Sequence, residues 1–364
     1  MSASRFVILF GLAWLTFGQS GQSTTKQVTV SGDGEWADTG VSLQPGDTVT
    51  IEATGTLTYD TGKESGPEGM QRGFRDLLRV LPSNDAGRGA LLGRIGSNPA
   101  ARSFLVGARR EMKVPVAGNL FLSVNQGSND QPSGSFSVTI TRVAGVAPQL
   151  DPNVRLPRFT QAELNSIPRR VTDAFGNAGD RVNFVIIGSQ EQMESALKAA
   201  GWVSVDKTPT DAVIRGLIAS LSKEGYTTLP MSQLMLYGRD QDYGWAQADP
   251  ILVIQSRHHF RLWRAPFTAD GQVVWVGAGT HDIGLERDQR NGKLTHKIDP
   301  KVDDERDYIA ESLKQSGMVA KEEYLTPTNA VKTARTATGG SFESDGRTLI
   351  VYLLPDTANA PGAK

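Results

Sequence analysis

The chain has 364 residues, which is enough for about two domains of ordinary size. Its 38 basic and 39 acidic residues give a formal net charge of −1, and this balance excludes a strongly basic nucleic-acid-binding protein. Cysteine is absent, which excludes disulfides, iron–sulfur clusters, cysteine-ligated zinc and a cysteine nucleophile.

The first twenty residues have the pattern of a secretory signal peptide. Arg5 precedes a short apolar run, residues 6–17, and small and polar residues follow it. The run is shorter than the roughly 20 apolar residues of a transmembrane helix. We predict a signal peptide over residues 1–20, cleaved after Gly18 or Ser20, and a secreted or periplasmic mature chain without a membrane-spanning segment. An uncleaved N-terminal anchor is the alternative.

Residues 26–145 have the pattern of short strands separated by turns. Apolar and polar residues alternate, which is typical of half-buried strands, and helical periodicity is weak. The alternating segments are 28–30, 49–59, 120–124 and 136–140. Turn motifs such as Pro45-Gly46-Asp47 separate them. We predict an all-β antiparallel sandwich over this range.

One part of this range is rich in basic residues. Between residues 72 and 113 the acidic residues are Asp76, Asp85 and Glu111. The basic residues there are Arg72, Arg75, Arg79, Arg88, Arg94, Arg102, Arg109, Arg110 and Lys113. Such a patch suits acidic glycans or lipids, and the alternative is a solvated loop surface.

A series of motifs runs in order through the same range. They are Trp36, Asp38-Thr39-Gly40, Pro45-Gly46-Asp47, Tyr59, Gly66-Pro67-Glu68-Gly69, Gly93-Arg94-Ile95-Gly96, Gly118-Asn119-Leu120 and Gly134-Ser135-Phe136-Ser137-Val138. Together they resemble the galactose-binding, calcium-dependent bacterial lectins of the PA-IL type. The resemblance covers about a third of the chain and implies a lectin-like sandwich.

The resemblance also implies a calcium ion, held between a tyrosine carbonyl and a loop rich in Asn and Asp, to which sugar hydroxyls bind. It implies carbohydrate binding by Tyr59, Asn125, Asn129 and Asp130, and calcium ligation by Tyr59, Asn125 and Asp130. Gln126 and Pro132 replace two expected ligands, and only Asp130 offers a carboxylate. We therefore expect calcium affinity to be weak or absent. A spacer, an adhesion surface or a partner-binding module is the alternative to a glycan-binding domain.

Residues 146–158 are rich in Pro and predict a short linker. Beyond it, residues 159–355 predict an α+β domain, followed by a tail over 356–364. The expected strands are 182–188, 234–237, 252–263, 273–278, 294–298 and 349–353.

Three helices are expected in the same domain. The first follows a capping box formed by Ser189 and Gln192 and ends at Gly201. The second covers 211–223. The third begins at Asp299, which caps it, and ends at Gly317. The lone pair of glycines in Gly277-Ala278-Gly279 is interpreted as a close-packing feature and not as a phosphate loop.

The four histidines of the chain lie within a short stretch of this domain. The candidate catalytic or metal-binding residues are His258, His259, His281, Asp282, His296 and Asp299. Adjacent strand residues point to opposite faces, so His258 and His259 cannot both ligate one metal in a regular strand. An acid–base or metal site would combine one of them with His281 or Asp282 and His296. The alternative is structural: buried histidines in internal hydrogen bonds, with Asp299 as a helix cap.

Arginines follow the histidine pair along the same predicted strand. Arg257, Arg261 and Arg264 suit an anionic ligand or internal ion pairs, and we favour pairs with acidic residues of the following helix. The expected partners are Asp303, Asp304 and Asp307.

Motifs in this domain also occur in a fixed order. They include Asp180-Arg181-Val182-Asn183, Arg257-His258-His259-Phe260-Arg261-Leu262-Trp263, Val274-Trp275-Val276-Gly277, His281-Asp282-Ile283-Gly284, Thr295-His296-Lys297-Ile298-Asp299-Pro300 and Asp345-Gly346-Arg347. Together they resemble the LssY C-terminal domain of bacterial envelope-associated proteins, for which the resemblance implies no particular reaction.

We thus predict a mixed multidomain protein with an all-β lectin-like sandwich followed by an α+β domain. A non-enzymatic envelope or secreted protein that binds glycans or envelope components is favoured, with no nucleic-acid partner. The alternative is a metal-assisted hydrolase, which would need the histidines to line one cleft. Calcium is the one cofactor that the sequence suggests.

Overall fold

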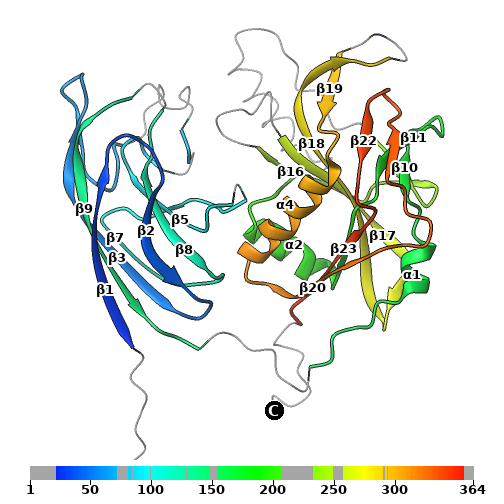
Figure 1. Cartoon of the computed structure of the whole chain (residues 1–364), viewed down its shortest axis with the longest axis horizontal. Helices are drawn as coiled ribbons and strands as arrows, with labels where there is room; N and C mark the ends of the chain where they lie inside the picture. Colours follow the sequence, from blue (N-terminus) through cyan, green and yellow to red (C-terminus); the bar gives the residue numbers. More distant parts are fainter. Residues whose placement is uncertain are drawn as a thin grey trace, which may run out of the picture.

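A computed structural model describes residues 22–71, 81–83, 86–98, 100–127, 130–146, 154–205, 233–248, 257–289, 292 and 294–355. The predicted signal peptide, the helix over 211–223, Asn129, most of the linker and the tail lie outside these residues. Within them the chain is mostly β-strand, and no helix is long and apolar enough to cross a membrane. The described strands form two lobes that lie side by side (Figure 1).

The N-terminal lobe consists of two antiparallel sheets. One has the order β1 (Ser23–Ser31), β9 (Ser133–Val143), β3 (Thr48–Thr58) and β4 (Glu64–Ser65), with β7 (Arg109–Lys113) paired to β3. The other has the order β2 (Ala37–Leu43), β8 (Gly118–Val124), β5 (Leu91–Ile95) and β6 (Phe104–Leu105). The second sheet is the layer nearer the C-terminal lobe (Figure 1).

The core of this lobe lies between its two sheets. Alternate residues such as Val49, Ile51 and Val138 on one sheet pack with Leu120 and Leu122 on the other, all of them fully buried. The period-two alternation therefore predicted the strands that carry most of the core. It did not predict β2, β5 and β7.

The C-terminal lobe is built on an eight-stranded mixed sheet. Its order is β13 (Val203–Ser204), β16 (Tyr243–Ala248), β17 (Arg257–Ala269), β18 (Gln272–Arg287), β12 (Phe184–Ile187), β23 (Thr348–Leu353) and β20 (Val319–Leu325), with β19 (Leu294–Ile298) paired to β18. A smaller sheet has β11 (Ala178–Arg181), β10 (Arg170–Thr172), β14 (Met235–Leu236) and β15 (Arg239–Asp240), and β21 (Thr333–Arg335) pairs with β22 (Ser341–Glu343).

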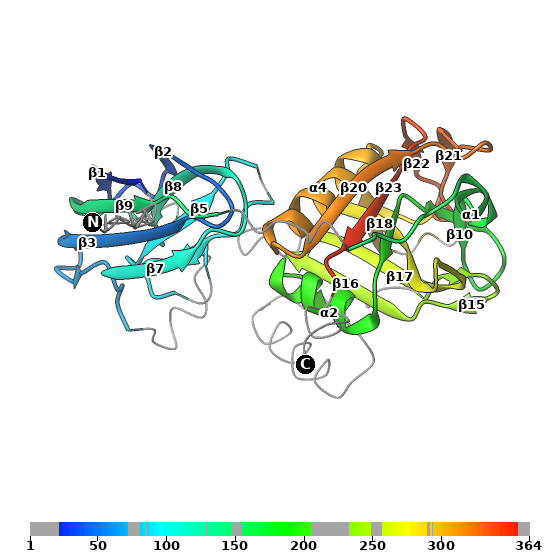
Figure 2. The same ribbon diagram turned by 90° about the horizontal axis from the view of Figure 1, so that it is seen from below.

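Helices pack on both faces of the large sheet. On one face, α2 (Gln190–Ala199) and α4 (Val302–Gln315) cover a core that includes Phe184, Phe260 and Ile309. On the other face, α1 (Gln161–Ser166) and the smaller sheet cover a second core. Figure 2 shows α2 and α4 on the side of the lobe that faces the sandwich.

The starts of helices α2 and α4 can be compared directly with the capping residues predicted from the sequence. The capping box of Ser189 and Gln192 is present at the start of α2, and Gly201 follows that helix with a positive φ, as predicted. The start predicted for the third helix was wrong by two residues. The helix α4 begins at Val302, and Asp299 accepts a hydrogen bond from the Lys301 N–H (2.9 Å) in a turn before it.

The close approach of α4 to the sheet depends on glycines. A Cβ at Gly279 would lie 2.5 Å from Cδ1 of Ile309 on α4, and one at Gly277 would overlap the ring of Phe184. The close-packing interpretation of these glycines is therefore confirmed. Asn183 completes the junction, because its side-chain amide donates to the carbonyl oxygens of Gly279 (2.9 Å) and Val302 (3.2 Å).

Candidate functional site

The hairpin of β17 and β18 sets the positions of the candidate histidines. His258 pairs with His281, and Arg257 pairs with Asp282. Because neighbouring residues of a strand point to opposite faces, these two pairs lie on opposite sides of the sheet. The sequence expectation that His258 and His259 cannot share one metal follows the same geometry.

On the α4 face, His258 forms a pair with a buried glutamate. Its Nδ1 lies 2.5 Å from Oε2 of Glu305, whose side chain is 1% exposed. The imidazole is stacked between His281, at 4.2 Å between ring centroids, and Tyr308, at 3.6 Å. Burial raises the pKa of Glu305 well above its usual value, and burial with the nearby His281 lowers the pKa of His258 to about 3. The pair therefore holds one proton over a wide pH range.

On the opposite face, Asp282 is the centre of a second group. Its Oδ2 lies 3.0 Å from Nη2 of Arg257, 3.5 Å from Nδ1 of His296 and 3.6 Å from Nδ1 of His259. His259 also contacts the Thr280 hydroxyl through Nε2 (3.0 Å). Burial raises the pKa of Asp282 and lowers the pKa of both histidines. The neutral imidazoles and the arginine thus surround one buried carboxylate.

The structure brings together the predicted site residues in two groups and not in one cleft. His258 and His281 form one group, and His259, Asp282 and His296 form the other. Asp299 lies beside the first group: its backbone N–H donates to the His281 carbonyl (2.8 Å), and its side chain accepts from the Lys301 N–H. Burial lowers the pKa of His281 and raises that of Glu305, and the negative charge of Asp299 acts to raise both pKa values. Among the described residues, no three His, Cys, Asp or Glu side chains are placed to hold a metal ion.

Arg257 and Arg261 of β17 are paired, but not with the helix that the sequence suggested, and Arg264 is exposed. Arg257 pairs with Asp282, and Arg261 lies 3.9 Å from Asp180 on β11. These arginines point away from α4, so its acidic residues bind other partners. Arg306, 1% exposed, forms ion pairs with Asp303, Asp307 and Asp345.

In the N-terminal lobe, the loop expected to bind calcium is held by internal hydrogen bonds. The Asn125 side chain, fully buried, accepts from the Ser83 N–H (2.9 Å) and donates to the carbonyls of Ser83, Ala86 and Gly87. The Tyr59 carbonyl accepts from the Gly62 N–H (2.8 Å). Both groups are therefore engaged within the protein.

The third expected ligand, Asp130, already has a cationic partner. Its Oδ1 lies 2.7 Å from Nη2 of Arg88, and Oδ2 accepts from the Gly127 N–H (3.3 Å). The Arg88 guanidinium also lies 3.9 Å from the centre of the Tyr59 ring. A calcium ion would have to displace this guanidinium and break the Asn125 bonds. The described residues of this loop, which exclude Ser128 and Asn129, therefore do not fit a calcium site.

A row of side chains on β2, β8 and β5 was not predicted as a site. Asp38 pairs with Phe121, and Phe121 pairs with Arg94. The Arg94 guanidinium lies 4.4 Å from the Trp36 ring centre and 5.4 Å from that of Phe121. In the part of the chain that the structure describes, Arg94 has no ion pair, although it is half-buried. Asn119 donates to Asp38 (3.2 Å) at the other end of the row.

The C-terminal lobe matches a known family. The family model described as "LssY C-terminus" matches residues 164–348, about half of the chain. The chain belongs to the LssY C-terminus family. Both histidine groups and α4 lie within the matched residues, so they are features of the LssY domain.

The other comparisons concern the whole chain and the N-terminal lobe. A solved structure described as "EclA N-terminal domain; PllA-like lectin" is 24% identical, with a TM-score of 0.25. The match covers 32% of this chain and 94% of that chain. No curated protein matches the chain.

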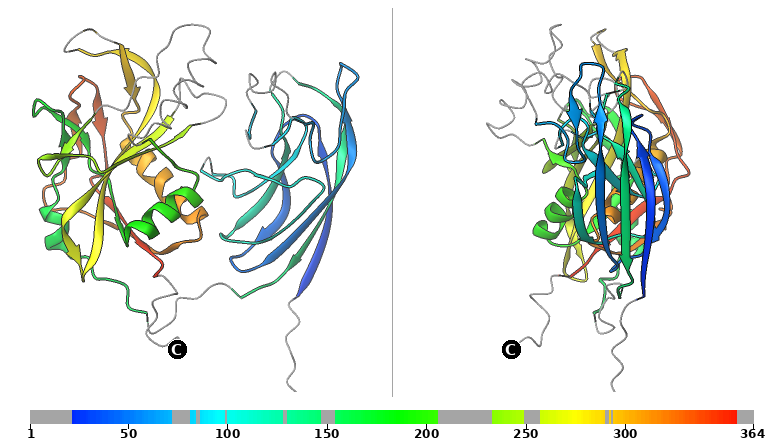
Figure 3. Two further views of the ribbon diagram at one scale, coloured as in Figure 1. Left: turned by 180° about the vertical axis from the view of Figure 1, so that it is seen from behind. Right: turned by 90° about the vertical axis from the view of Figure 1, so that its left-hand side faces the viewer.

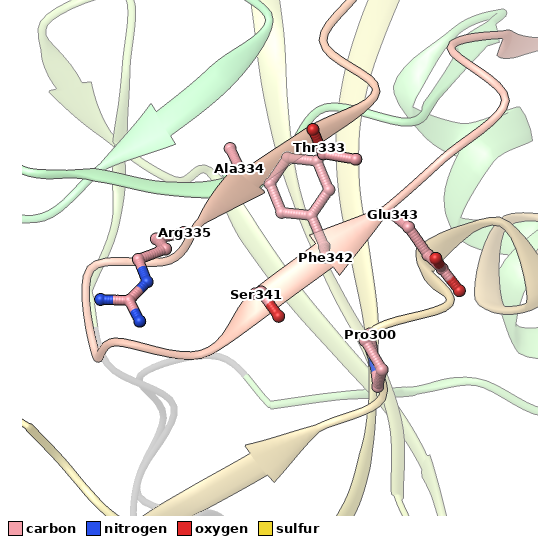
Figure 4. A pocket seen from close by; sticks show the side chains of 7 residues that line it. All are labelled: Pro300, Thr333, Ala334, Arg335, Ser341, Phe342 and Glu343. Atoms are coloured by element: carbon pink, nitrogen blue, oxygen red, sulfur yellow. The ribbon is translucent and has the colours of Figure 1, made fainter.

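The LssY domain also contains a pocket of about 500 Å³ (Figure 4), and none of its lining residues belongs to either histidine group. It is lined by Pro300, Thr333, Ala334, Arg335, Ser341, Phe342 and Glu343. Arg335 and Glu343 lie at its opposite ends (Figure 4). The volume would admit a small ligand, but these side chains do not form a convergent set of polar groups.

Proposed function

We propose that this is an exported envelope or secreted protein whose N-terminal sandwich binds acidic glycans, joined to an LssY domain without a catalytic centre of its own. One observation carries the proposal: Arg94 lies between Trp36 and Phe121 without a carboxylate partner among the described residues. An arginine in this setting is held in place by the rings and keeps its donors for a ligand.

The chemistry of the row suits an acidic sugar. The guanidinium can form two parallel hydrogen bonds to a carboxylate or a phosphate. Beside it, the half-buried Phe121 ring offers an apolar surface, and the exposed Asp38 and Asn119 can bond to hydroxyl groups. Among the described basic residues of this lobe, Arg88 is paired with Asp130 and Arg109 with Glu52. Arg94 is therefore the basic group that we assign to the ligand.

The enzyme alternative has less support from the geometry. A metal-assisted hydrolase would need several ligands in one cleft. His259, Asp282 and His296 do lie together on one face of the sheet, but among the described residues no three such side chains are placed to hold a metal ion. Glu305 is paired with His258 and Asp282 with Arg257, so each buried carboxylate has an internal partner. We therefore favour binding over catalysis.

Glycan binding tests the proposal. The full mature protein is titrated with an oligosaccharide of uronic acids and with a neutral galactose oligosaccharide, each with calcium and with a chelator. We expect the acidic ligand to bind in both conditions and to weaken with added salt. Substituting Arg94→Gln is expected to weaken this binding by about tenfold or more, since a charge-assisted bond contributes roughly 1.5–3 kcal/mol.

The matched control is Arg109→Gln, which removes an exposed arginine of the same lobe that is already paired with Glu52 and Glu111. It should bind as the wild type does. Equal affinity of the Arg94→Gln variant and the wild type would contradict the assigned site. Absence of binding to any acidic or neutral glycan would contradict the proposed function.

Export is supported by Arg5 and the short apolar run that follows it. The mass of the protein recovered outside the cytoplasm of an expressing bacterium tests it. We expect a chain that lacks the residues up to Gly18 or Ser20. A full-length chain retained in the cytoplasm would contradict export.

A further inference from the structure

The loop that follows Asn125 contains a mostly buried carboxylate, Asp130, which is paired with an arginine of the same chain. The side chain of Asp130 is only 14% exposed, and a buried carboxylate without a counter-ion is unfavourable. The resemblance to calcium-dependent lectins implies a metal ion as that counter-ion. We infer that the Arg88 guanidinium takes the place of the ion and makes this loop independent of calcium.

The Arg88 guanidinium occupies a position where its surroundings favour a positive charge. Its side chain is 10% exposed, and Nη2 lies 2.7 Å from Asp130 Oδ1. The guanidinium covers the face of Tyr59, which is 3% exposed, at 3.9 Å from the ring centre. An aromatic face attracts a cation electrostatically, so the ring and the carboxylate both favour a positive charge at this point.

The neighbouring hydrogen bonds keep the loop closed without a metal. Asn125 joins the loop to residues 83–87 by its side chain, and its backbone carbonyl accepts from Gly89 N–H (2.8 Å), directly after Arg88. Gln126 donates to the carbonyls of Gly32 and Asp130. The side-chain and backbone oxygens of Asn125, which could otherwise ligate a calcium ion, thus accept hydrogen bonds from within the protein.

The test is the effect of calcium on the full-length mature protein. Thermal unfolding is measured with millimolar CaCl₂ and with a chelator, and binding of Ca²⁺ alone is measured by calorimetry. We expect the same Tm in both conditions, to within about 1 °C, and no saturable binding. A Tm raised by several degrees in calcium, or one bound ion per chain, would overturn the inference.

Variants test the role of Arg88 itself. Arg88→Met should lower the Tm, because the carboxylate of Asp130 loses its guanidinium counter-ion, and the double variant Arg88→Met, Asp130→Leu should recover part of the loss. Arg109→Met, which breaks an exposed ion pair of the same lobe, is the control and should change the Tm little. If Arg88→Met and Arg109→Met behave alike, Arg88 is not the counter-ion. None of these readouts depends on glycan binding at Arg94, so either proposal can fail alone.

Discussion

At the scale of residues, the buried pair of Glu305 and His258 makes the stability of the LssY domain depend on pH. The pair of Glu305 and His258 keeps one proton in the folded protein from about pH 3 up to the raised pKa of Glu305. Unfolded, the pair binds two protons below pH 4.5, one between 4.5 and 6.5, and none above 6.5. The contribution of the pair to stability is therefore level between pH 4.5 and 6.5, where both states bind one proton. It falls below pH 4.5, where the unfolded state binds more protons, and above pH 6.5, where the folded state binds more.

Replacing Glu305 by Gln should remove the decrease in the free energy of unfolding above pH 6.5, because an amide stays uncharged as the pH rises. We expect the wild type to lose up to about 1.4 kcal/mol per pH unit from this proton above pH 6.5, and Glu305→Gln to lose less. Urea unfolding at pH 5.5 and pH 8.5 measures both. Glu343→Gln, an exposed carboxyl of the same domain, serves as control. Parallel pH curves for Glu305→Gln and the wild type would argue against the assignment.

At the scale of elements, the long hairpin of β17 and β18 organises the LssY domain. It pairs His258 with His281 and Arg257 with Asp282, and it carries α4 on one face. Gly279 leaves room for Ile309 of α4, and Gly277 leaves room for the ring of Phe184 on the neighbouring strand β12. The histidines are therefore positioned by the same contacts that form the core.

A methyl group at Gly277 tests this packing. Gly277→Ala would drive Cβ into the Phe184 ring and should lower the free energy of unfolding by about 1–3 kcal/mol. Urea unfolding measures it. Adding Phe184→Leu to Gly277→Ala should recover part of the lost free energy of unfolding, since the smaller side chain makes room for the methyl group. Gly340→Ala has only side-chain atoms of Thr336 and Glu286 near the new Cβ and should cost much less. Equal losses for the two glycine variants would contradict the packing argument.

At the scale of the whole molecule, the lobes lie side by side (Figure 3), and among the described residues two hydrogen bonds join them. Arg102 of the sandwich donates to the carbonyl of Ala199 at the end of α2 (3.0 Å), and Gln315 of α4 approaches the carbonyl of Ile95 (3.5 Å). The exposed Arg102 also suits the negative end of the α2 dipole. We expect this exposed contact to influence the relative position of the lobes more than the stability of either lobe.

Removing the Arg102 side chain should therefore change shape and not stability. For Arg102→Ala we expect unfolding free energies within about 0.5 kcal/mol of the wild type, with a larger radius of gyration in solution scattering. Arg109→Ala, whose partners Glu52 and Glu111 are in the sandwich alone, is the control. An unchanged scattering profile for Arg102→Ala would show that other contacts hold the lobes.

The sequence by itself determined the local elements and the family. Alternation predicted the main strands of the sandwich, the capping box predicted α2, and the ordered motifs identified the LssY domain, because all three depend on neighbouring residues. Tertiary structure decided which charges meet. Arg257 pairs across the hairpin with Asp282 and not with α4, and Arg88 reaches Asp130 through a loop contact. The row of Asp38, Phe121 and Arg94 joins three strands that are distant in the chain. Such neighbours are set by the register of the strands, which cannot be predicted from the pattern of adjacent residues.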